Sequence, residues 1–197
     1  MAGNVIVIAG PTASGKTALS IALAKELGGE IVSADSMQVY RGMDIGTAKA
    51  TGAEQSEAAH HMLDVADPGE AYSAARYVDE AAACCEDILA RGKLPVITGG
   101  TGLYIDSLLS GRSFAETEDS REVREAIARE YDERGGAAML EKLRQIDPQR
   151  AAILAAPDKR RIVRALEIYA LTGETATAHD EATRALPPRY NAARIVL

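Results

Sequence analysis

The sequence predicts an α/β protein in which helices flank a parallel sheet. Short runs of β-branched residues alternate with helix-like segments, and the stretch beyond residue 115 becomes charged and helical throughout. Only 4% of the 197 residues are aromatic, so Val, Ile, Leu and Ala must build the core. A chain with 47% hydrophobic and 26% charged residues can bury such a core, which excludes an intrinsically disordered protein.

The first three elements follow each other closely. Residues 4–9 (NVIVIA) form a short apolar run that is typical of a strand buried on both faces. Leu19, Leu23 and Leu27 then recur at helical spacing, and a pair of glycines ends this helix. A second strand is expected over 30–34.

The next two elements repeat the pattern. A helix is expected over 74–91, with Ser73 as its N-cap, and a third strand over 94–98. Strands that alternate with helices require crossover connections and hence a parallel sheet. Because ligands bind outside the carboxyl ends of such strands, we expect the loop after Ala9, Asp35 and the turn 99–102 to meet in one crevice.

Beyond residue 115 we expect a helical insertion. Helices are predicted over about 120–136, over 137–146, from Asp147-Pro148 onward and over 158–171. A polar loop and a last buried strand over 192–197 then complete the chain. The predicted domains are an α/β core made of 1–114 with 181–197, and a helical insertion over 115–180.

The segment GPTASGKT fits G-x-x-x-x-G-K-[ST] and lies between a strand and a helix, as a phosphate-binding loop must. Backbone N–H groups and the helix N-terminus would surround the anion, Lys16 would reach two phosphates, and Thr17 would ligate Mg²⁺. This predicts a P-loop NTPase-like fold. The predicted diphosphate cradle consists of Gly10, Pro11, Thr12, Ala13, Ser14, Gly15, Lys16 and Thr17.

The other two strand ends indicate the chemistry. Asp35 follows the second strand and is a candidate base, although an Asp at this place is also a common turn residue. The third strand ends in GGTGLY and offers no acidic residue where an NTPase keeps its magnesium-ordering Asp. The loop alone leaves open whether a nucleoside triphosphate or a diphosphate ester is bound, but this gap disfavours a kinase or an ATPase.

Five separated blocks together resemble the tRNA dimethylallyltransferase (tRNA isopentenyltransferase) family. They are GPTASGKT from residue 10, SADSMQVYRGMDIGTAK from 33, HHMLDVADPGEAYSAARY from 60, ITGGTGLYIDSLL from 97 and DKRRIVRALEIYALTG from 158. The resemblance implies transfer of the dimethylallyl group from dimethylallyl diphosphate to N6 of the adenosine next to the tRNA anticodon, with release of pyrophosphate. Mg²⁺ on Thr17 is the implied cofactor.

The resemblance also implies roles for particular residues. Asp35 is the implied base, and Thr101 lies against the reacting centre. The residues implied to contact the tRNA anticodon stem-loop are Asp35, Ser36, Met37, Gln38, Thr101, Arg124, Arg160, Arg161 and Arg164. From the residues alone, a solvated helix face explains these arginines nearly as well.

Other interpretations remain open. The net charge of -7 argues against a nucleic-acid partner, although Lys159, Arg160, Arg161 and Arg164 place four positive charges within six residues. The alternatives are a P-loop small-molecule or nucleoside kinase, and a truncated homologue that only binds RNA. Family members have about 300 residues by resemblance, so we expect this chain to bind diphosphate poorly and to modify tRNA weakly.

Some expectations concern the setting of the protein. We expect a cytoplasmic protein without a membrane partner, because no apolar run approaches the roughly 20 residues that span a bilayer. We also expect a monomer. His60 and His61 are expected to be a structural pair with satisfied hydrogen bonds. The adjacent Cys84 and Cys85 are expected to be helix residues, since their spacing suits neither a disulfide nor a metal site.

Overall fold

The computed structural model of the chain describes residues 2–111 and 118–197. The chain divides into two compact units. Met1–Ser113 and Pro187–Leu197 form the first, which we call the sheet unit, and Phe114–Leu186 form the second, the helical unit. Each unit has its own core, so each is described by itself.

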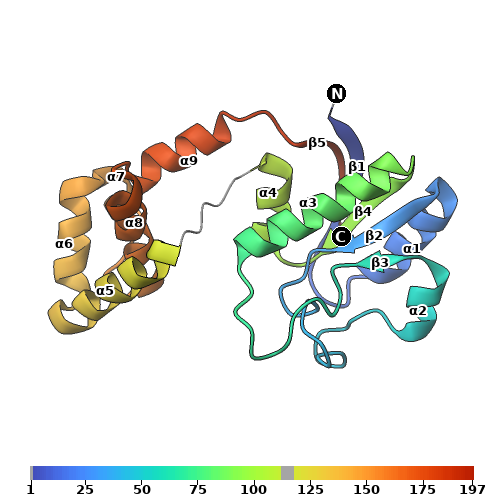
Figure 1. Ribbon diagram of the computed structural model, residues 1–197, viewed down its shortest axis with the longest axis horizontal. Coiled ribbons are helices and arrows are strands. Elements are labelled where there is room, and N and C mark those ends of the chain that lie inside the picture. Colours follow the sequence, from blue (N-terminus) through green and yellow to red (C-terminus); the bar gives the residue numbers. More distant parts are fainter. Residues whose placement is uncertain (1, 112–117) are drawn as a thin grey trace. The chain divides into compact units, whose positions relative to one another are not determined.

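All paired strands in the sheet unit run parallel, as predicted, and Figure 1 shows them as one layer. Among the described residues the order across the sheet is β3-β2-β4-β1-β5. The register pairs Ile8 of the first strand with Thr98 of the fourth. The strands are β1 (Gly3–Ala9), β2 (Gly29–Ser33), β3 (His60–His61), β4 (Leu94–Gly99) and β5 (Tyr190–Val196).

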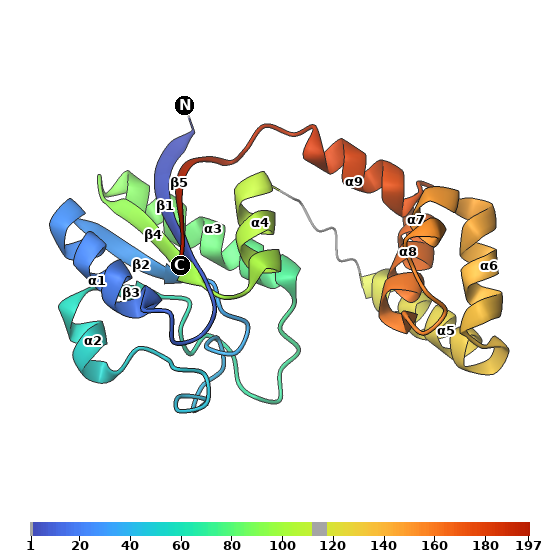
Figure 2. The same ribbon diagram turned by 180° about the vertical axis from the view of Figure 1, so that it is seen from behind.

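Four helices of the sheet unit are α1 (Lys16–Leu27), α2 (Gly52–Glu57), α3 (Ala74–Ala90) and α4 (Gly102–Ser110). The connection through α1 crosses the sheet from β1 towards β2, and the connection through α3 crosses back to β4. Because both crossovers are right-handed, this reversal places α1 and α3 on opposite faces (Figure 1 and Figure 2). After β1 the chain crosses to β2, whereas after β4 it continues through the helical unit to β5, on the other side of β1. Ligands of parallel sheets bind at the carboxyl ends of two neighbouring strands whose chains leave in opposite directions in this way.

The carboxyl ends of β2 and β4 lie unusually close together. The Ala34 N–H donates to Thr98 O at 2.7 Å, and the Thr101 N–H donates to Ala34 O at 3.1 Å. A methyl group on Gly99 would collide with the Ala34 carbonyl, so only glycine permits this approach. The turn after β4 is thus tied directly to the segment that follows β2.

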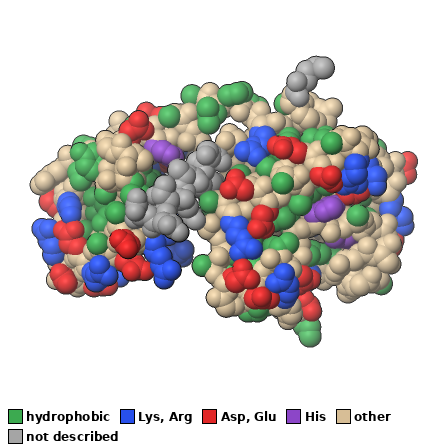
Figure 3. Space-filling view, viewed as in Figure 1, with side chains coloured by type: hydrophobic (Ala, Val, Ile, Leu, Met, Phe, Trp, Pro, Cys, Tyr) green, Lys and Arg blue, Asp and Glu red, His purple; other side chains and the backbone are tan. Residues whose placement is uncertain are grey.

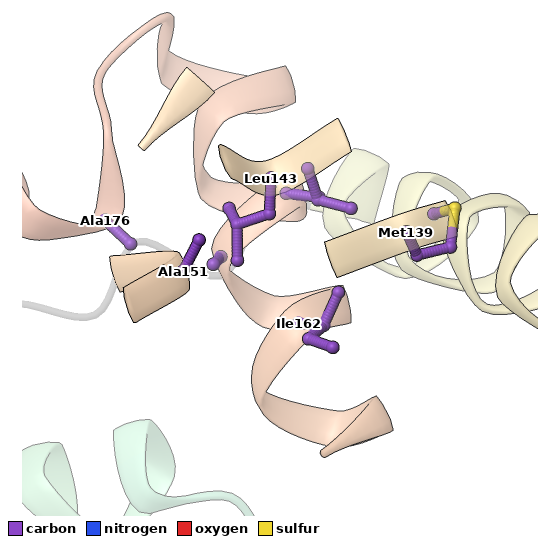
Figure 4. Packing of buried hydrophobic residues seen from close by; sticks show 7 residues of the cluster. Met139, Leu143, Ala151, Ile162 and Ala176 are labelled. Carbon is purple, nitrogen blue, oxygen red and sulfur yellow. The ribbon is translucent and has the colours of Figure 1, made fainter. Parts of the chain in front are cut away.

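The helical unit consists of α5 (Glu118–Arg134), α6 (Gly136–Ile146), α7 (Pro148–Ala152), α8 (Lys159–Thr172) and α9 (Ala176–Arg184). Figure 4 shows side chains of these helices converging on one apolar cluster. Its buried members are Met139, Leu143, Ala151, Ile162, Ala165, Leu166 and Ala176. The members of this core all come from the helical unit, so the unit buries apolar side chains of its own.

A buried carboxylate joins α7 and α9. Asp147 accepts from the Arg150 N–H at 3.0 Å as the cap of α7, and it also accepts from the N–H and the hydroxyl of Thr177 at 2.9 and 2.7 Å. Burial by itself would raise the pKa of Asp147, but these hydrogen bonds outweigh it and lower the pKa below its ordinary value. Asp147 therefore stabilises the helical unit in its charged form.

Several elements differ from the sequence-based expectations. The polar loop expected after Gly173 is wrong, because α9 forms there with Thr175 as its N-cap. The expected domain border after residue 180 falls within this helix, and the expected border after residue 114 lies outside the described residues. The short elements α2, β3 and α4 were not predicted.

The last strand was expected to be buried, and this is wrong. In the described part of the sheet β5 pairs only with β1 and forms an edge, so its side chains are mostly exposed. Val196 is 78% exposed. The apolar sequence of the strand predicted its conformation correctly, but an apolar run does not distinguish an edge from a central position.

Candidate active site

The predicted phosphate-binding loop connects β1 with α1. Two of its residues adopt left-handed backbone conformations, Ala13 with φ 65° and Gly15 with φ 91°. The Gly15 carbonyl accepts the Leu19 N–H at 3.1 Å, so α1 begins directly from the loop. The helix N-terminus consequently points its free N–H groups towards the space that the loop encloses.

The loop contains polar groups that lack partners. Ser14 Oγ is buried and makes no hydrogen bond among the described residues. Such an atom is unfavourable unless a ligand satisfies it, and a phosphate oxygen would do so. The Thr17 hydroxyl also has no hydrogen-bond partner in the described part of the chain, while Lys16 Nζ donates to Pro11 O across the loop. The loop thus has the donors that an anion requires.

The three strand ends meet, as predicted. A methyl group on Gly100 would lie 3.5 Å from Gly10 O and 3.9 Å from Asp35 Oδ2. The start of the phosphate-binding loop, the turn after β4 and the candidate base after β2 therefore border the same small space. The absence of a side chain at Gly100 keeps that space open.

The Asp35 carboxylate is held by its own backbone. Its Oδ1 accepts the N–H groups of Met37 at 2.9 Å and Gln38 at 3.4 Å. Its Oδ2 faces Gly100 and has no hydrogen-bond partner among the described residues. Oδ1 thus fixes the orientation of the carboxylate, while Oδ2 remains available to accept a hydrogen bond from a ligand.

The Thr101 side chain lies beside this carboxylate. Its Oγ1 accepts the Ser36 N–H at 2.9 Å and lies 3.3 Å from Ser36 Oγ. Thr101 also precedes α4, whose N-terminus it begins. The sequence-predicted residues Asp35, Ser36 and Thr101 are therefore brought together from two different strand ends.

Gln38 points towards its own chain. Its Oε1 accepts from Ser33 Oγ at 3.0 Å, and its Nε2 donates to the carbonyls of Thr47 and Ala48 at 3.0 and 3.3 Å. Both ends of the amide are thus engaged with groups of the protein. In contrast, Met37 is 45% exposed and is free to contact a ligand.

Sequence analysis missed Lys49, which organises the loop after Gln38. Its side chain is buried, and Nζ donates to Tyr40 O at 2.8 Å, Asp44 Oδ1 at 2.7 Å and Asp64 Oδ1 at 2.6 Å. Burial disfavours its charged form, yet the two carboxylates outweigh this effect and raise its pKa. The only signal in the sequence was its place within the DIGTAK segment.

A stacked pair of tyrosines contacts the end of β2, close to Asp35 in the sequence. The rings of Tyr77 and Tyr104 lie 4.0 Å apart with 11° between their planes. The Tyr77 hydroxyl donates to Ser33 O at 3.1 Å, directly before the segment that carries Asp35. Burial raises the pKa of both phenols, so both remain neutral hydrogen-bond donors at physiological pH.

The candidate RNA-contacting arginines lie in the helical unit and fall into two groups. Arg160 and Arg161 are exposed at the start of α8, and neither has an ion-pair partner in the part of the chain that the structure describes. Arg124 and Arg164 both pair with the buried Glu167. Figure 3 shows acidic and basic side chains interspersed on the visible side of each unit.

The remaining candidates have structural partners. His60 Nδ1 lies 2.8 Å from Ala58 O and His61 Nε2 lies 2.7 Å from Glu30 Oε2, so the expectation of a structural histidine pair is confirmed. Within residues 2–111 and 118–197, no three His, Cys, Asp or Glu side chains cluster as metal ligands. No helix of these residues is both long and apolar enough to cross a membrane.

Comparisons with known proteins agree with this arrangement. A family model described as IPP transferase matches residues 38–197, and one described as isopentenyl transferase matches residues 3–67. A tRNA dimethylallyltransferase of Roseiflexus sp. (strain RS-1) is 48% identical over 192 residues, which are 98% of this chain and 62% of the relative. One of Acetivibrio thermocellus is 44% identical over 188 residues, covering 95% and 60% of the two chains.

Solved structures give the same result. The tRNA isopentenylpyrophosphate transferase of Bacillus halodurans is 41% identical with a TM-score of 0.62, and the match covers 100% of this chain and 60% of that one. A eukaryotic dimethylallyltransferase described as acting on tRNA is 31% identical with a TM-score of 0.82, covering 99% and 48%. This chain thus spans about 60% of the length of the curated relatives in the comparison.

Proposed function

Because this chain belongs to the IPP transferase family, we propose that its site transfers a dimethylallyl group from dimethylallyl diphosphate to N6 of the adenosine beside a tRNA anticodon. The partners under this proposal are dimethylallyl diphosphate and the anticodon stem-loop of tRNA. The observation that carries the proposal is the meeting of the phosphate-binding loop, Asp35 and Thr101 around Gly100.

The phosphate-binding loop would hold the leaving group. As the bond between the allylic carbon and the diphosphate oxygen breaks, negative charge grows on the diphosphate. The N-terminus of α1, the Lys16 ammonium and the unpartnered Ser14 hydroxyl are donors placed to stabilise that charge. A leaving group held in this way exposes an electron-poor carbon to the neighbouring space.

Asp35 would act on the nucleophile. The adenine amine is a weak nucleophile, so it has to be oriented and has to lose a proton as its nitrogen bonds to carbon. The Asp35 Oδ2 atom is free to accept one N6–H, and the backbone N–H groups on Oδ1 hold the carboxylate still. Thr101, fixed to Ser36, would line the space between base and leaving group.

The adenosine has to leave its stack to reach this space. Met37 is exposed next to Asp35 and would contact the extruded base. Gln38 would act indirectly, since its amide holds the loop of Thr47 and Ala48. The arginines of the helical unit, Arg124, Arg160, Arg161 and Arg164, would bind the phosphates of the RNA backbone.

Magnesium is part of the proposal. The Thr17 hydroxyl, which has no partner among the described residues, would hold Mg²⁺ together with oxygens of the substrate diphosphate. When bound, the ion would neutralise charge on the leaving diphosphate. A hydroxyl oxygen is a ligand that suits Mg²⁺, and the phosphate oxygens of a substrate would complete its coordination.

A kinase is the less favoured alternative. The end of β4 and the turn after it, Gly99-Gly100-Thr101-Gly102, provide no carboxylate for the metal of a nucleoside triphosphate. The two functions predict different ligands, which a thermal-unfolding measurement can distinguish. Dimethylallyl diphosphate should raise the melting temperature of the chain more than ATP at the same concentration, and the reverse order would favour the kinase.

The proposal is tested by a single-turnover assay with isotope-labelled dimethylallyl diphosphate and an anticodon stem-loop RNA. We expect label on N6 of the adenosine beside the anticodon and an equal amount of pyrophosphate. A matched RNA with guanosine at that place should remain unlabelled. Labelled RNA in both samples, or hydrolysis of the diphosphate without transfer, would contradict the proposal.

A further inference from the structure

Glu167 is an unusual residue for the interior of a helical unit. It lies on the buried face of α8 among apolar side chains, and its side chain is 0% exposed. Burying a carboxylate is unfavourable unless charged partners and hydrogen bonds compensate. Apolar residues of similar volume often serve stability as well as a buried ion pair does, so a role for this carboxylate beyond stability is worth testing.

The partners of Glu167 are two arginines on neighbouring helices that pack together. Arg124 of α5 donates from Nε at 3.0 and 3.1 Å to the two carboxylate oxygens, and its Nη2 lies 3.0 Å from Oε1. Arg164 Nη1 of α8 lies 3.0 Å from Oε2. One carboxylate therefore fixes two guanidinium groups from two helices.

The two arginines still face solvent. Their side chains are 45% and 42% exposed, so a ligand in solution can reach both guanidinium groups. A phosphate group fits such a pair of guanidiniums, because its oxygens accept charge-assisted hydrogen bonds from planar donors.

We infer that Glu167 is a positioning residue for RNA binding. It holds Arg124 and Arg164 in the orientation that receives a backbone phosphate of the anticodon stem-loop. This inference rests on the proposed function, since it takes tRNA as the partner. The negative charge of Glu167 therefore strengthens the binding of a polyanion.

The inference makes an unusual prediction for Glu167→Gln. Simple electrostatics predicts tighter RNA binding, because the variant removes a negative charge. If Glu167 positions the arginines, the same variant binds a fluorescein-labelled anticodon stem-loop about tenfold more weakly, the loss expected of one charge-assisted contact. The slope of log K against log salt should also become shallower by about 1.

Glu141→Gln is the matched control. Glu141 lies in the same unit, is 55% exposed and pairs with the exposed Arg144, so the substitution changes the charge equally without touching the cluster. Its RNA affinity should equal that of the parent chain or exceed it slightly. Circular dichroism and thermal unfolding of both variants verify that the helices remain folded.

A double-mutant cycle separates positioning from a general structural effect. In a chain that carries Arg124→Ala and Arg164→Ala, Glu167→Gln should change RNA affinity by less than about twofold, because its targets are absent. Should Glu167→Gln fail to fold, Arg124→Lys and Arg164→Lys carry the test. Lysine keeps the positive charge but lacks the planar guanidinium group that donates two parallel hydrogen bonds, so each variant should bind RNA more weakly. Unchanged RNA affinity in both variants would overturn the inference.

The outcomes distinguish the inference from the function on which it rests. A parent chain that does not bind the stem-loop would refute tRNA as the partner, and with it the role of Glu167. A parent chain that binds the stem-loop while Glu167→Gln binds equally well or better would refute the positioning role only. The positioning role would also be refuted if Glu167→Gln lowered RNA affinity tenfold in the chain that carries Arg124→Ala and Arg164→Ala.

Discussion

In the sheet unit, backbone groups at strand ends hold the candidate catalytic side chains, whereas in the helical unit one buried side chain holds two candidate RNA-binding arginines. Asp35 and Thr101 are fixed by the N–H groups of Met37 and Ser36. Arg124 is fixed by Glu167. Under the proposed function, the chemistry would therefore depend on how the chain is folded, and RNA binding would depend on a contact that a single substitution removes.

The largest expected effect concerns the free oxygen of Asp35. In Asp35→Asn, Oδ1 can still accept the Met37 N–H, so the turn should survive while the base is lost. Single-turnover transfer to the stem-loop should fall by at least about 100-fold, as expected when a general base is removed. RNA affinity should stay within about twofold.

The same variant also tests whether Asp35 has a chemical role or a structural one. If Asp35→Asn lost RNA affinity and transfer together, Asp35 would serve structure or substrate binding and not proton transfer. Circular dichroism of the variant would then show which of the two it serves.

The next effect concerns the close approach of β2 and β4. In Gly99→Ala the new methyl group collides with the Ala34 carbonyl, which should lower the free energy of unfolding by about 3 kcal/mol. Gly102→Ala is the control, since nothing lies within 4 Å of its new methyl group and it begins a helix. Equal urea midpoints for the two variants would show that the strand ends do not need glycine at residue 99.

A smaller effect concerns acid stability of the sheet unit. The Arg91 guanidinium, aided by Lys93 and His61, holds the pKa of Glu30 well below its ordinary value of 4.5 in spite of burial. A lowered pKa means that the stabilisation is complete above about pH 4.5 and is lost as the pH falls through the lower, folded value. Glu30→Gln should therefore be less stable by about 2 kcal/mol at pH 7.

The pH dependence of Glu30→Gln provides its own check. The stability difference between parent and variant should shrink as the pH falls below about 4, measured by urea unfolding. The exposed Glu57, paired with Lys25, gives the control, because Glu57→Gln should alter stability little at any pH. A difference for Glu30→Gln that stayed constant down to pH 2 would contradict the assignment of the effect to its charge.

The smallest expected effect on stability concerns the exposed arginines. Arg160→Ala and Arg161→Ala remove side chains without an ion-pair partner among the described residues, so unfolding free energies should change by less than about 0.5 kcal/mol. Each should still weaken stem-loop binding, by about threefold at low salt, through loss of one phosphate contact. Unchanged binding in both would restrict RNA recognition to the arginines that Glu167 holds.

The sequence predicted the fold class and the strand ends that meet at the candidate site, but it did not predict every element around them. The strand-loop-helix pattern and the rule for parallel strands were enough to bring Asp35 and the phosphate-binding loop together, because both depend on backbone geometry. The helix α9 was missed because alanine is its only apolar residue type, and it is held by distant groups, Asp147 and Arg150. The roles of Lys49 and Glu167 likewise depend on side chains far away in the sequence.

A structure of the chain bound to a sulfur-bridged, non-transferable analogue of dimethylallyl diphosphate would test the central claim most directly. We expect the diphosphate within the Gly10–Thr17 loop, with a diphosphate oxygen on Ser14 Oγ and the allylic carbon facing the space next to Asp35 Oδ2 and Thr101. A diphosphate bound outside the loop, or an allylic carbon directed away from Asp35, would contradict the account.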